Sequence, residues 1–332
     1  RIDRLPEPHK PTLKVASVIG FTFELGLMAQ VHPARLSNQV LVDQAELLDQ
    51  RDFIIRDYLR EPNGRSDTYS FRQQVTQEVS YETLLFTQRR ELHCTLADAI
   101  RANTPEATDQ IAYHAFLGEA WPIAMRYQIV AGRRAKALFA NLQSIDHFST
   151  ALISAEHLPP GETLAERQEI HSALGELQLT TGQVEQAAVN LQLALDLARE
   201  MGDQNAEAEA CRWIARSYEM RGEYSSALEW IDRGLGALGE RLVAASLEMR
   251  LLAGLINTRQ GNYREARQQA LASRLAASEL DDFSIVARSH SLIGHLDRLR
   301  SMTDSALEHL QEALVIYRET DNLTGQATVL NL

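Results

Sequence analysis

The chain has 332 residues, of which 45% are apolar and 23% are charged, and its formal net charge at pH 7 is -12. This composition is typical of an ordinary globular protein and excludes a disordered or fibrous chain. The acidic balance disfavours nucleic acid or an anionic membrane as the main partner, because both attract clustered Lys and Arg.

Residues 1–103 have the pattern of three helices followed by a β-hairpin. Helices are expected at "TLKVASVIG", "LGLMAQV" and "NQVLVDQAELLDQ". A β-like "DFIIRDY" at 52–58, a polar tip "LREPNGRSD" and a second strand "TYSF" at 68–71 then predict the hairpin. Three helices and a hairpin predict a winged helix, and the next stretch, "RQQVTQEVSYETLLFTQRRELHCTLADAI", predicts two further helices.

A winged helix often binds DNA, and its third helix must then read the major groove with basic or amide side chains. Here that helix carries Asp43, Glu46 and Asp49 against only Arg51 near its end. Because DNA phosphates would repel these carboxylates, we expect the domain to pack between other parts of the protein rather than to bind nucleic acid.

Residues 104–158 have the same helical texture with poorer spacing. Thr104 and Pro105 form a typical helix start. The stretch "GEAWPIA" at 118–124 looks like a phrase that recurs further along, with one residue inserted. We therefore expect two degenerate helical pairs that join the N-terminal region to residues 159–332.

Residues 159–332 contain that phrase at a fixed interval. Its copies are "TTGQVEQA" (180–187), "MRGEYSSA" (220–227), "RQGNYREA" (259–266) and "LRSMTDSA" (299–306). Their final alanines are 40, 39 and 40 residues apart, a period typical of a solenoid. A capping-box spacing, Thr163 to Glu166, opens this array after the break "LPPG".

Small residues stand at two further fixed places in each copy. Twelve residues before each final alanine come Gly175, Ala215, Gly254 and Gly294, and seven residues after it come Ala194, Gly234, Ser273 and Ala313. A glycine inside a helix costs about 1 kcal/mol relative to alanine. Its return at one phase therefore predicts that two antiparallel helices cross closely there.

A glycine in the phrase, Gly182, Gly222 or Gly261, falls between the two helices, where it can end the first in a left-handed conformation. In the last copy Ser301 replaces it, which we interpret as drift. The small residue, turn glycine, aromatic and alanine resemble the tetratricopeptide repeat over roughly residues 166–320. The resemblance implies a mainly α fold, with the winged-helix domain followed by an α-α superhelix of about four repeats. The period is longer than the usual 34 residues.

A larger resemblance covers nearly the whole chain. The stretches "LKVASVIGFTFEL", "YSFRQQVTQEVSYETLL", "QRRELH" and "YHAFLGEAWPIAMRYQIVAGRRA", followed by the repeats, resemble the C-terminal part of bacterial class III adenylate cyclase proteins with a STAND-type ATPase. The resemblance extends to ATP-dependent transcription activators of the maltose-regulator type. It implies ATP and Mg in the parent protein, and a nucleotide-sensing residue after "FR", which is Gln73 here and cannot carry charge.

No complete catalytic or metal site is expected within the chain, and so no cofactor. A phosphate-binding loop is missing, since no Lys directly follows a Gly. His290 and His295 lie about 140 degrees apart around a helix and do not share a face. The stretch "RRELHC" at 89–94 is expected to be an amphipathic helix face, and Cys94 and Cys211 are expected to be small buried residues.

The inner groove of the repeats is the candidate site, because first helices usually present ligand contacts there. The phase of the repeat predicts these exposed first-helix residues: Glu209, Arg212, Arg216, Glu219, Arg288, Ser291, His295 and Arg298. The mixture can hold a peptide or a neighbouring domain through charged hydrogen bonds, or it can be a plain solvated face.

We expect a regulatory, protein-interaction segment of a signalling ATPase coupled to adenylate cyclase. Its partners would be a protein or peptide and its own upstream ATPase domain. The alternatives are the sensor of a transcription activator and a free-standing scaffold. No apolar stretch is long enough to cross a membrane, and the start does not resemble a signal peptide, so the cytoplasm is expected. The chain starts at Arg and ends inside a helical pattern, as expected for a piece of a longer protein.

Overall fold

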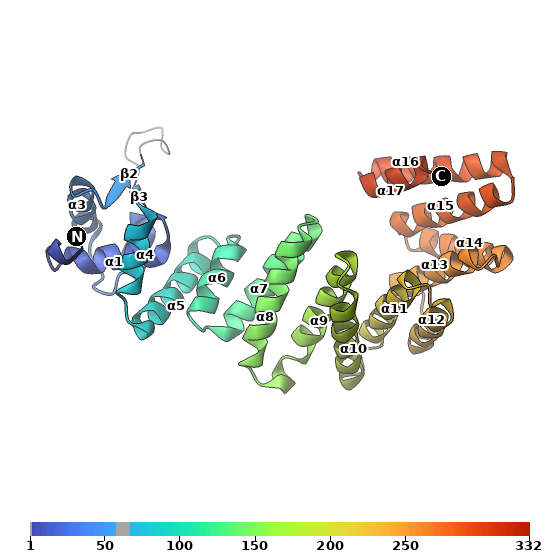
Figure 1. Cartoon of the computed structure of the whole chain (residues 1–332), viewed down its shortest axis with the longest axis horizontal. Helices are drawn as coiled ribbons and strands as arrows, with labels where there is room; N and C mark the ends of the chain where they lie inside the picture. The colour runs from blue at the N-terminus through green and yellow to red at the C-terminus, as the bar shows by residue number, and fades with distance from the viewer. Residues whose placement is uncertain (1, 58–66) are drawn as a thin grey trace. The chain divides into compact units, whose positions relative to one another are not determined.

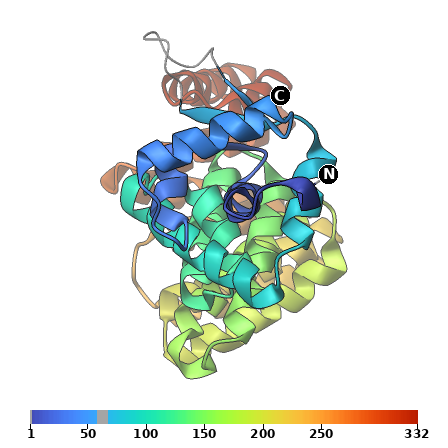
Figure 2. The same ribbon diagram turned by 90° about the vertical axis from the view of Figure 1, so that its left-hand side faces the viewer.

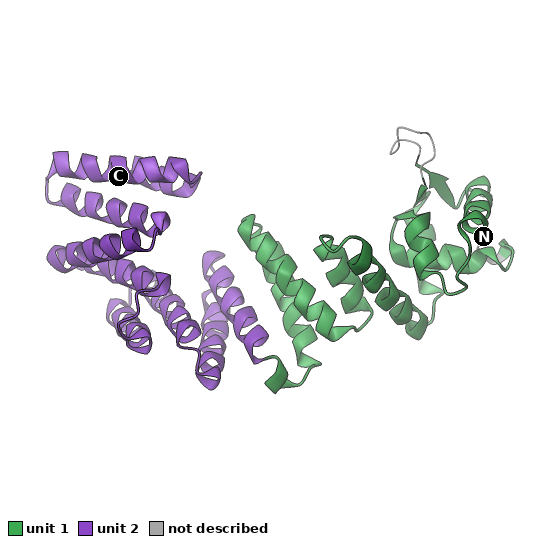
Figure 3. Cartoon of the chain, turned by 180° about the vertical axis from the view of Figure 1, so that it is seen from behind, with its two compact units in different colours: residues 1–163 green, residues 164–332 purple. Residues whose placement is uncertain are grey.

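The structure, a computed structural model, describes residues 2–57 and 67–332. It has two compact units, unit 1 with residues 1–163 and unit 2 with residues 164–332 (Figure 3). The expected hairpin tip, "LREPNGRSD" at 59–67, lies outside the described residues except for Asp67.

Unit 1 begins with helices and a small sheet and continues with helices alone (Figure 1). Its described elements are η1 (Ile2–Arg4), α1 (His9–Ile19), β1 (Thr22–Glu24), α2 (Leu25–Val31), α3 (Asn38–Gln50), β2 (Ile54–Arg56), β3 (Thr68–Phe71), α4 (Gln74–Glu82), α5 (Phe86–Asn103), α6 (Thr108–Leu117), α7 (Trp121–Ala137), α8 (Asn141–Glu156) and η2 (Pro160–Glu162).

The sheet has strand order β1-β3-β2, and both pairings are antiparallel. The predicted bounds of α2, α3 and β3 are confirmed, and β1 is an additional strand that pairs Phe23 with Tyr69. The three helices and the hairpin that led to the winged-helix prediction are therefore present. The winged-helix name itself stays a prediction.

Figure 2 shows the N-terminal helices of unit 1 in blue, facing the viewer. One hydrophobic core joins these helices to the sheet. Phe71 of β3, Leu13 of α1 and Leu41 of α3 are each at most 1% exposed. The same core continues into Leu96 of α5 and Ile111 of α6. The sheet region and the first helices after it are thus packed as one body.

Residues 104–158 contain three helices rather than the expected two pairs. The expected helix start at Thr104 and Pro105 is wrong, because Thr104 caps the end of α5 and α6 begins at Thr108. The residue before a proline is pushed out of the helical conformation. Pro105 therefore ends α5 instead of starting α6.

The pair α7 and α8 is a degenerate repeat-like unit, and it lies within the stretch where such pairs were expected. A Cβ atom on Gly132 would lie 2.9 Å from the Phe148 ring, and the Ser144 hydroxyl donates a hydrogen bond to the Gly132 carbonyl at 2.8 Å. Ser144 thus stands where later copies have alanine. Phe139, with φ 57°, takes the left-handed place of the turn glycine.

Unit 2 consists of helices in its described residues, and they pair in chain order. They are α9 (Leu164–Thr180), α10 (Val184–Met201), α11 (Gln204–Met220), α12 (Tyr224–Leu238), α13 (Ala244–Arg259), α14 (Tyr263–Glu279), α15 (Phe283–Leu299), α16 (Thr303–Glu319) and α17 (Leu323–Leu330). The four predicted helix-turn-helix units are confirmed, and the last is followed by a short helix. The first helices of neighbouring units, α9, α11, α13 and α15, contact one another in turn.

The small residues lie where the helices cross, as predicted. A Cβ atom on Gly175 would lie 2.5 Å from the Leu191 side chain. A Cβ atom on Gly294 would lie 2.7 Å from the Leu310 side chain and 3.1 Å from the Ala306 carbonyl oxygen. These approaches leave no room for a side chain, which explains why glycine returns at this phase.

The turns also share one geometry. Gly182, Gly222 and Gly261 have φ values of 80°, 78° and 81°. Ser301 has φ 59°, in the same left-handed region. The residue after each turn glycine donates its backbone N–H to the carbonyl five residues before it, and the Met302 N–H donates to the Asp297 carbonyl at 2.9 Å in the same way. The turn is therefore kept although the glycine is lost.

In the described ranges, 2–57 and 67–332, no helix is both long enough and apolar enough to cross a bilayer.

Candidate functional site on the first helices of the repeats

The predicted residues on α11 form ion pairs rather than free charges. The Arg212 Nε atom donates to Glu209 Oε2 at 3.0 Å, and the Arg212 guanidinium lies 4.2 Å from the centre of the Trp213 ring. The Arg212 side chain is only 16% exposed, so its predicted exposure is wrong, and this face of α11 carries a largely covered charge pair over an aromatic ring.

Glu219 is buried, so its predicted exposure is wrong. Its side chain is 1% exposed because it lies between two arginines, Arg216 on the same helix and Arg259 on α13 of the next repeat. The Arg216 Nη1 atom is 2.6 Å from Glu219 Oε2, and Arg259 forms an ion pair with the other carboxylate oxygen. One buried carboxylate therefore holds two guanidinium groups on neighbouring first helices.

A second ion pair joins α13 to α15, between Glu248 and Arg288. Ser291, which was expected to be exposed, is only 9% exposed. Its hydroxyl donates to the Ala287 carbonyl at 3.0 Å, and Tyr317 of α16 hydrogen-bonds to it. The second helix of the repeat therefore covers Ser291. On this part of α15, Arg288 is the residue that is accessible to a partner.

His295 and Arg298 lie together near the end of α15, the first helix on which the repeat phase placed them; Arg298 is exposed, whereas His295 is half-buried. The Arg298 Nη2 atom is 3.4 Å from His295 Nδ1. Partial burial, assisted by the Arg298 charge, lowers the pKa of His295 below its usual value of 6.5. The imidazole is therefore neutral at pH 7 and can accept a hydrogen bond.

We call Arg216, Arg259 and Arg288 the arginine row. Each is held by a carboxylate, yet the three side chains remain 40%, 45% and 44% exposed. A guanidinium has five N–H donors in a fixed plane, and one ion pair uses only part of them. The remaining donors are thus oriented by the fold and accessible to a partner.

Sequence reasoning missed Glu248 and Arg259. Glu248 is in phase with the repeat, because it stands 39 residues after Glu209 and 40 before Arg288, so carrying the period through the third copy would have found it. Arg259 stands 40 residues after Glu219, one more than the interval of 39 between these two copies, and the period alone does not locate it.

The other candidate residues are not members of the arginine row. Gln73 is exposed at the N-cap of α4, and its side chain makes no capping hydrogen bond. His290 shares a hydrogen bond of 3.0 Å with His309 on α16. Within the described part of the chain, no three His, Cys, Asp or Glu side chains are grouped closely enough to hold a metal ion.

The stretch at 89–94 lies on α5 and contacts α6. His93 is 1% exposed and hydrogen-bonds to His114, while the Cys94 thiol donates to the Gly118 carbonyl at 2.9 Å. Cys211 is fully buried, and burial raises the pKa of its thiol to about 11. The expected role of Cys211 as a buried apolar residue is confirmed.

No protein-family model matches the chain, and no curated protein matches it. Solved structures do. The crystal structure of a Rap protein complexed with Competence and Sporulation Factor is similar at 13% identity over 96% of this chain and 79% of that chain, with a TM-score of 0.56. The apo form of RapI is similar at 13% identity over 72% of this chain and 94% of that chain, with a TM-score of 0.52.

A STAND protein with a tetratricopeptide repeat sensor, from Pyrococcus horikoshii, is similar at 13% identity. The match covers 99% of this chain but 53% of that chain, with a TM-score of 0.47. Likeness at such identities concerns the fold alone. The chain is a mainly α protein whose repeats form a tetratricopeptide-like superhelix.

Proposed function

We propose that this chain is a regulatory, protein-interaction segment of a multidomain signalling ATPase, and that the first helices of unit 2 bind its protein or peptide partner. The observation that carries the proposal is the arginine row, Arg216, Arg259 and Arg288. Its members lie on α11, α13 and α15, and those helices contact one another in sequence.

The arrangement is suited to binding carboxylates and carbonyl groups of a polypeptide. Because each guanidinium is already held by Glu219 or Glu248, a partner loses little affinity in ordering it. Hydrogen bonds from a charged donor are also stronger than neutral ones. The likeness to a Rap protein crystallised with Competence and Sporulation Factor supports partner binding by a fold of this kind.

Binding would be transmitted through the N-terminal domain to an upstream ATPase domain in the complete protein. A coupling free energy of roughly 1 to 3 kcal/mol between partner and nucleotide would be sufficient. In this proposal ATP and Mg bind the upstream domain, Gln73 faces the nucleotide, the output is cyclic AMP, and the protein works in the cytoplasm.

The test is to sequence the coding DNA on both sides of this segment and to assay the complete product. ATP hydrolysis and cyclic AMP formation should both change when residues 160–332 are deleted. Unchanged activity and an unchanged response to stimuli would rule out a regulatory role for the repeats. A helix-turn-helix domain downstream, with no cyclic AMP formed, would instead make the chain the sensor of a transcription activator.

A further inference from the structure

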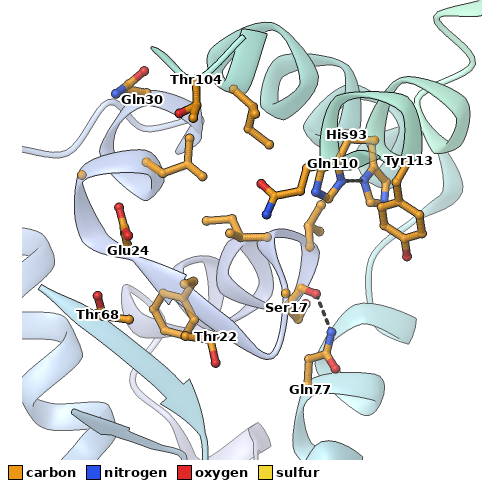
Figure 4. A pocket seen from close by; sticks show the side chains of 18 of the residues that line it. Ser17, Thr22, Glu24, Gln30, Thr68, Gln77, His93, Thr104, Gln110 and Tyr113 are labelled. Carbon is orange, nitrogen blue, oxygen red and sulfur yellow. Dashed lines mark hydrogen bonds between the residues drawn. The ribbon is translucent and has the colours of Figure 1, made fainter. Parts of the chain in front are cut away.

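Unit 1 contains a pocket of about 930 Å³ that the proposed function does not use (Figure 4). Residues of α1, β1, α2 and β3 line one part of it, and residues of α4, α5 and α6 line another. Pockets of this size accommodate small molecules, so its lining shows which chemistry it would accept.

The lining is acidic. Carboxylates come from Glu24 at β1, Glu78 on α4 and Asp109 on α6, and no Lys or Arg is among the described lining residues. Glu24 is exposed, and its carboxylate has no hydrogen bond or ion pair with a described residue. An unneutralised carboxylate in a pocket without basic groups attracts a cation.

A buried histidine pair forms one wall of the pocket. His93 and His114 are 1% and 5% exposed, and their Nδ1 atoms are 2.9 Å apart. The second nitrogen of His93 lies 3.1 Å from the Tyr81 hydroxyl, whereas His114 Nε2 has no partner among the described residues. A nitrogen left without a partner on a side chain this deeply buried is a hydrogen-bonding position that a ligand can fill.

The histidine pair adds no positive charge to the pocket. Burial, with the Arg89 charge, lowers the pKa of His93 to about 4, and burial, with the His93 charge, lowers that of His114 to about 3. Both rings are therefore neutral at pH 7. Tyr113, which is 58% exposed, adds an aromatic ring whose face also attracts cations. The Tyr81 ring already carries the Arg89 guanidinium, 5.0 Å from its centre.

We propose that this pocket binds a small organic cation, an amine or guanidinium on an aromatic or aliphatic body. Glu24 and Asp109 supply the opposite charge. Figure 4 shows Gln110 directed into the pocket from α6. Gln110 and His114 Nε2 hydrogen-bond to a polar group on the body of the ligand. The site is separate from the arginine row and does not depend on the function proposed for it.

The test uses three probes of matched size and different charge on the whole 332-residue chain. Tyramine is the cation, tyrosol is its neutral counterpart, and 4-hydroxyphenylacetate is the anion. Ligand-detected NMR titrations should show saturable binding of tyramine at least tenfold tighter than that of tyrosol, with the anion weakest. In the protein spectrum the ring signals of His114 should shift, while those of His147, which hydrogen-bonds to Gln128 outside the pocket, should not.

Two variants isolate the role of the carboxylate. Glu24→Gln should weaken tyramine binding about tenfold or more, because an ion pair becomes a neutral hydrogen bond. Glu91→Gln, an exposed carboxylate of α5 outside the lining, makes the same change in net charge and should leave the affinity unchanged. The proposal is overturned by equal affinity for the three probes, by tyramine binding that survives Glu24→Gln, or by the absence of saturable tyramine binding.

Discussion

Gly254 and Gly236 show that glycines of one repeat array have different structural roles. A Cβ atom on Gly254 would lie 2.9 Å from Leu292 and 3.3 Å from the Ala266 carbonyl oxygen. A Cβ atom on Gly236, inside α12, would meet nothing within 4 Å. The first glycine is required by a helix crossing, whereas the second only weakens its helix.

Gly254→Leu should therefore lower the free energy of unfolding of unit 2 by about 1 to 3 kcal/mol, because it overpacks the crossing. Gly236→Leu is the matched control, and it should be neutral or stabilising by up to about 1 kcal/mol through helix propensity. Urea unfolding followed by circular dichroism measures both. Equal stability of the Gly254→Leu variant and the parent would contradict the crossing assignment.

The backbone conformation of Ser301 is less favourable than that of the glycines at the same place in the other copies of the phrase. Its φ of 59° is in the left-handed region, where a side chain clashes with the backbone. The sequence shows that glycine is missing there, but only the structure shows that the turn is kept.

Ser301→Gly should raise the stability of unit 2 by about 1 kcal/mol, because glycine enters the left-handed region without that clash. The reverse change, Gly261→Ser, at φ 81°, should lower it by a similar amount. Thermal melting of both variants checks the pair. If Ser301→Gly melts below the parent, the serine has another role in the turn.

At the scale of elements, the sequence predicts best where pattern and end signals coincide. The helix α3 follows Ser37, whose hydroxyl accepts the Val40 N–H at its N-terminus, and its predicted bounds are those observed. The strand β1 has only three residues, too few to show an alternating pattern, and it forms because β3 offers a free edge. The turn of the pair α7 and α8 was not located from the sequence, because Phe139 and Ser144 occupy the glycine and alanine places.

The contact between α5 and α6 should depend on pH through the His93 and His114 pair. Their lowered pKa values, about 4 and about 3, mean that the unfolded chain binds protons first as the pH falls below 6.5. The free energy of unfolding of unit 1 should therefore be constant above pH 7 and decrease between pH 6.5 and 4, by at most about 1.4 kcal/mol per pH unit for each group.

His114→Phe removes one of these groups while keeping a ring in the buried site. The slope of unfolding free energy against pH, from urea titrations between pH 7 and 4, should be shallower in the variant than in the parent. His147→Phe is the comparison, since His147 lies in α8 of the same unit and hydrogen-bonds to Gln128, outside the contact between α5 and α6. Identical slopes for the parent and His114→Phe would show that the pair does not titrate as described.

At the scale of the whole molecule, the repeat period located the candidate surface but did not predict which of its charges are buried or paired. The phase placed Arg216 and Arg288 on the first helices, as observed. The burial of Glu219 depends on Arg259 from the next repeat, and such a contact cannot be read from one helix alone. The partner and the output domain remain proposals, because charges on a repeat surface restrict the chemistry of a partner without naming it.

The most direct test of the account replaces the arginine row in the complete protein. The triple variant Arg216→Gln, Arg259→Gln, Arg288→Gln is compared with Arg233→Gln, Arg264→Gln, Arg318→Gln, three exposed arginines on the second helices that give the same change in net charge. ATP hydrolysis and cyclic AMP output are measured in both. The account predicts that the first triple changes the output several-fold while the second leaves it unchanged. Equal behaviour of the two triples would contradict a binding role for the first helices.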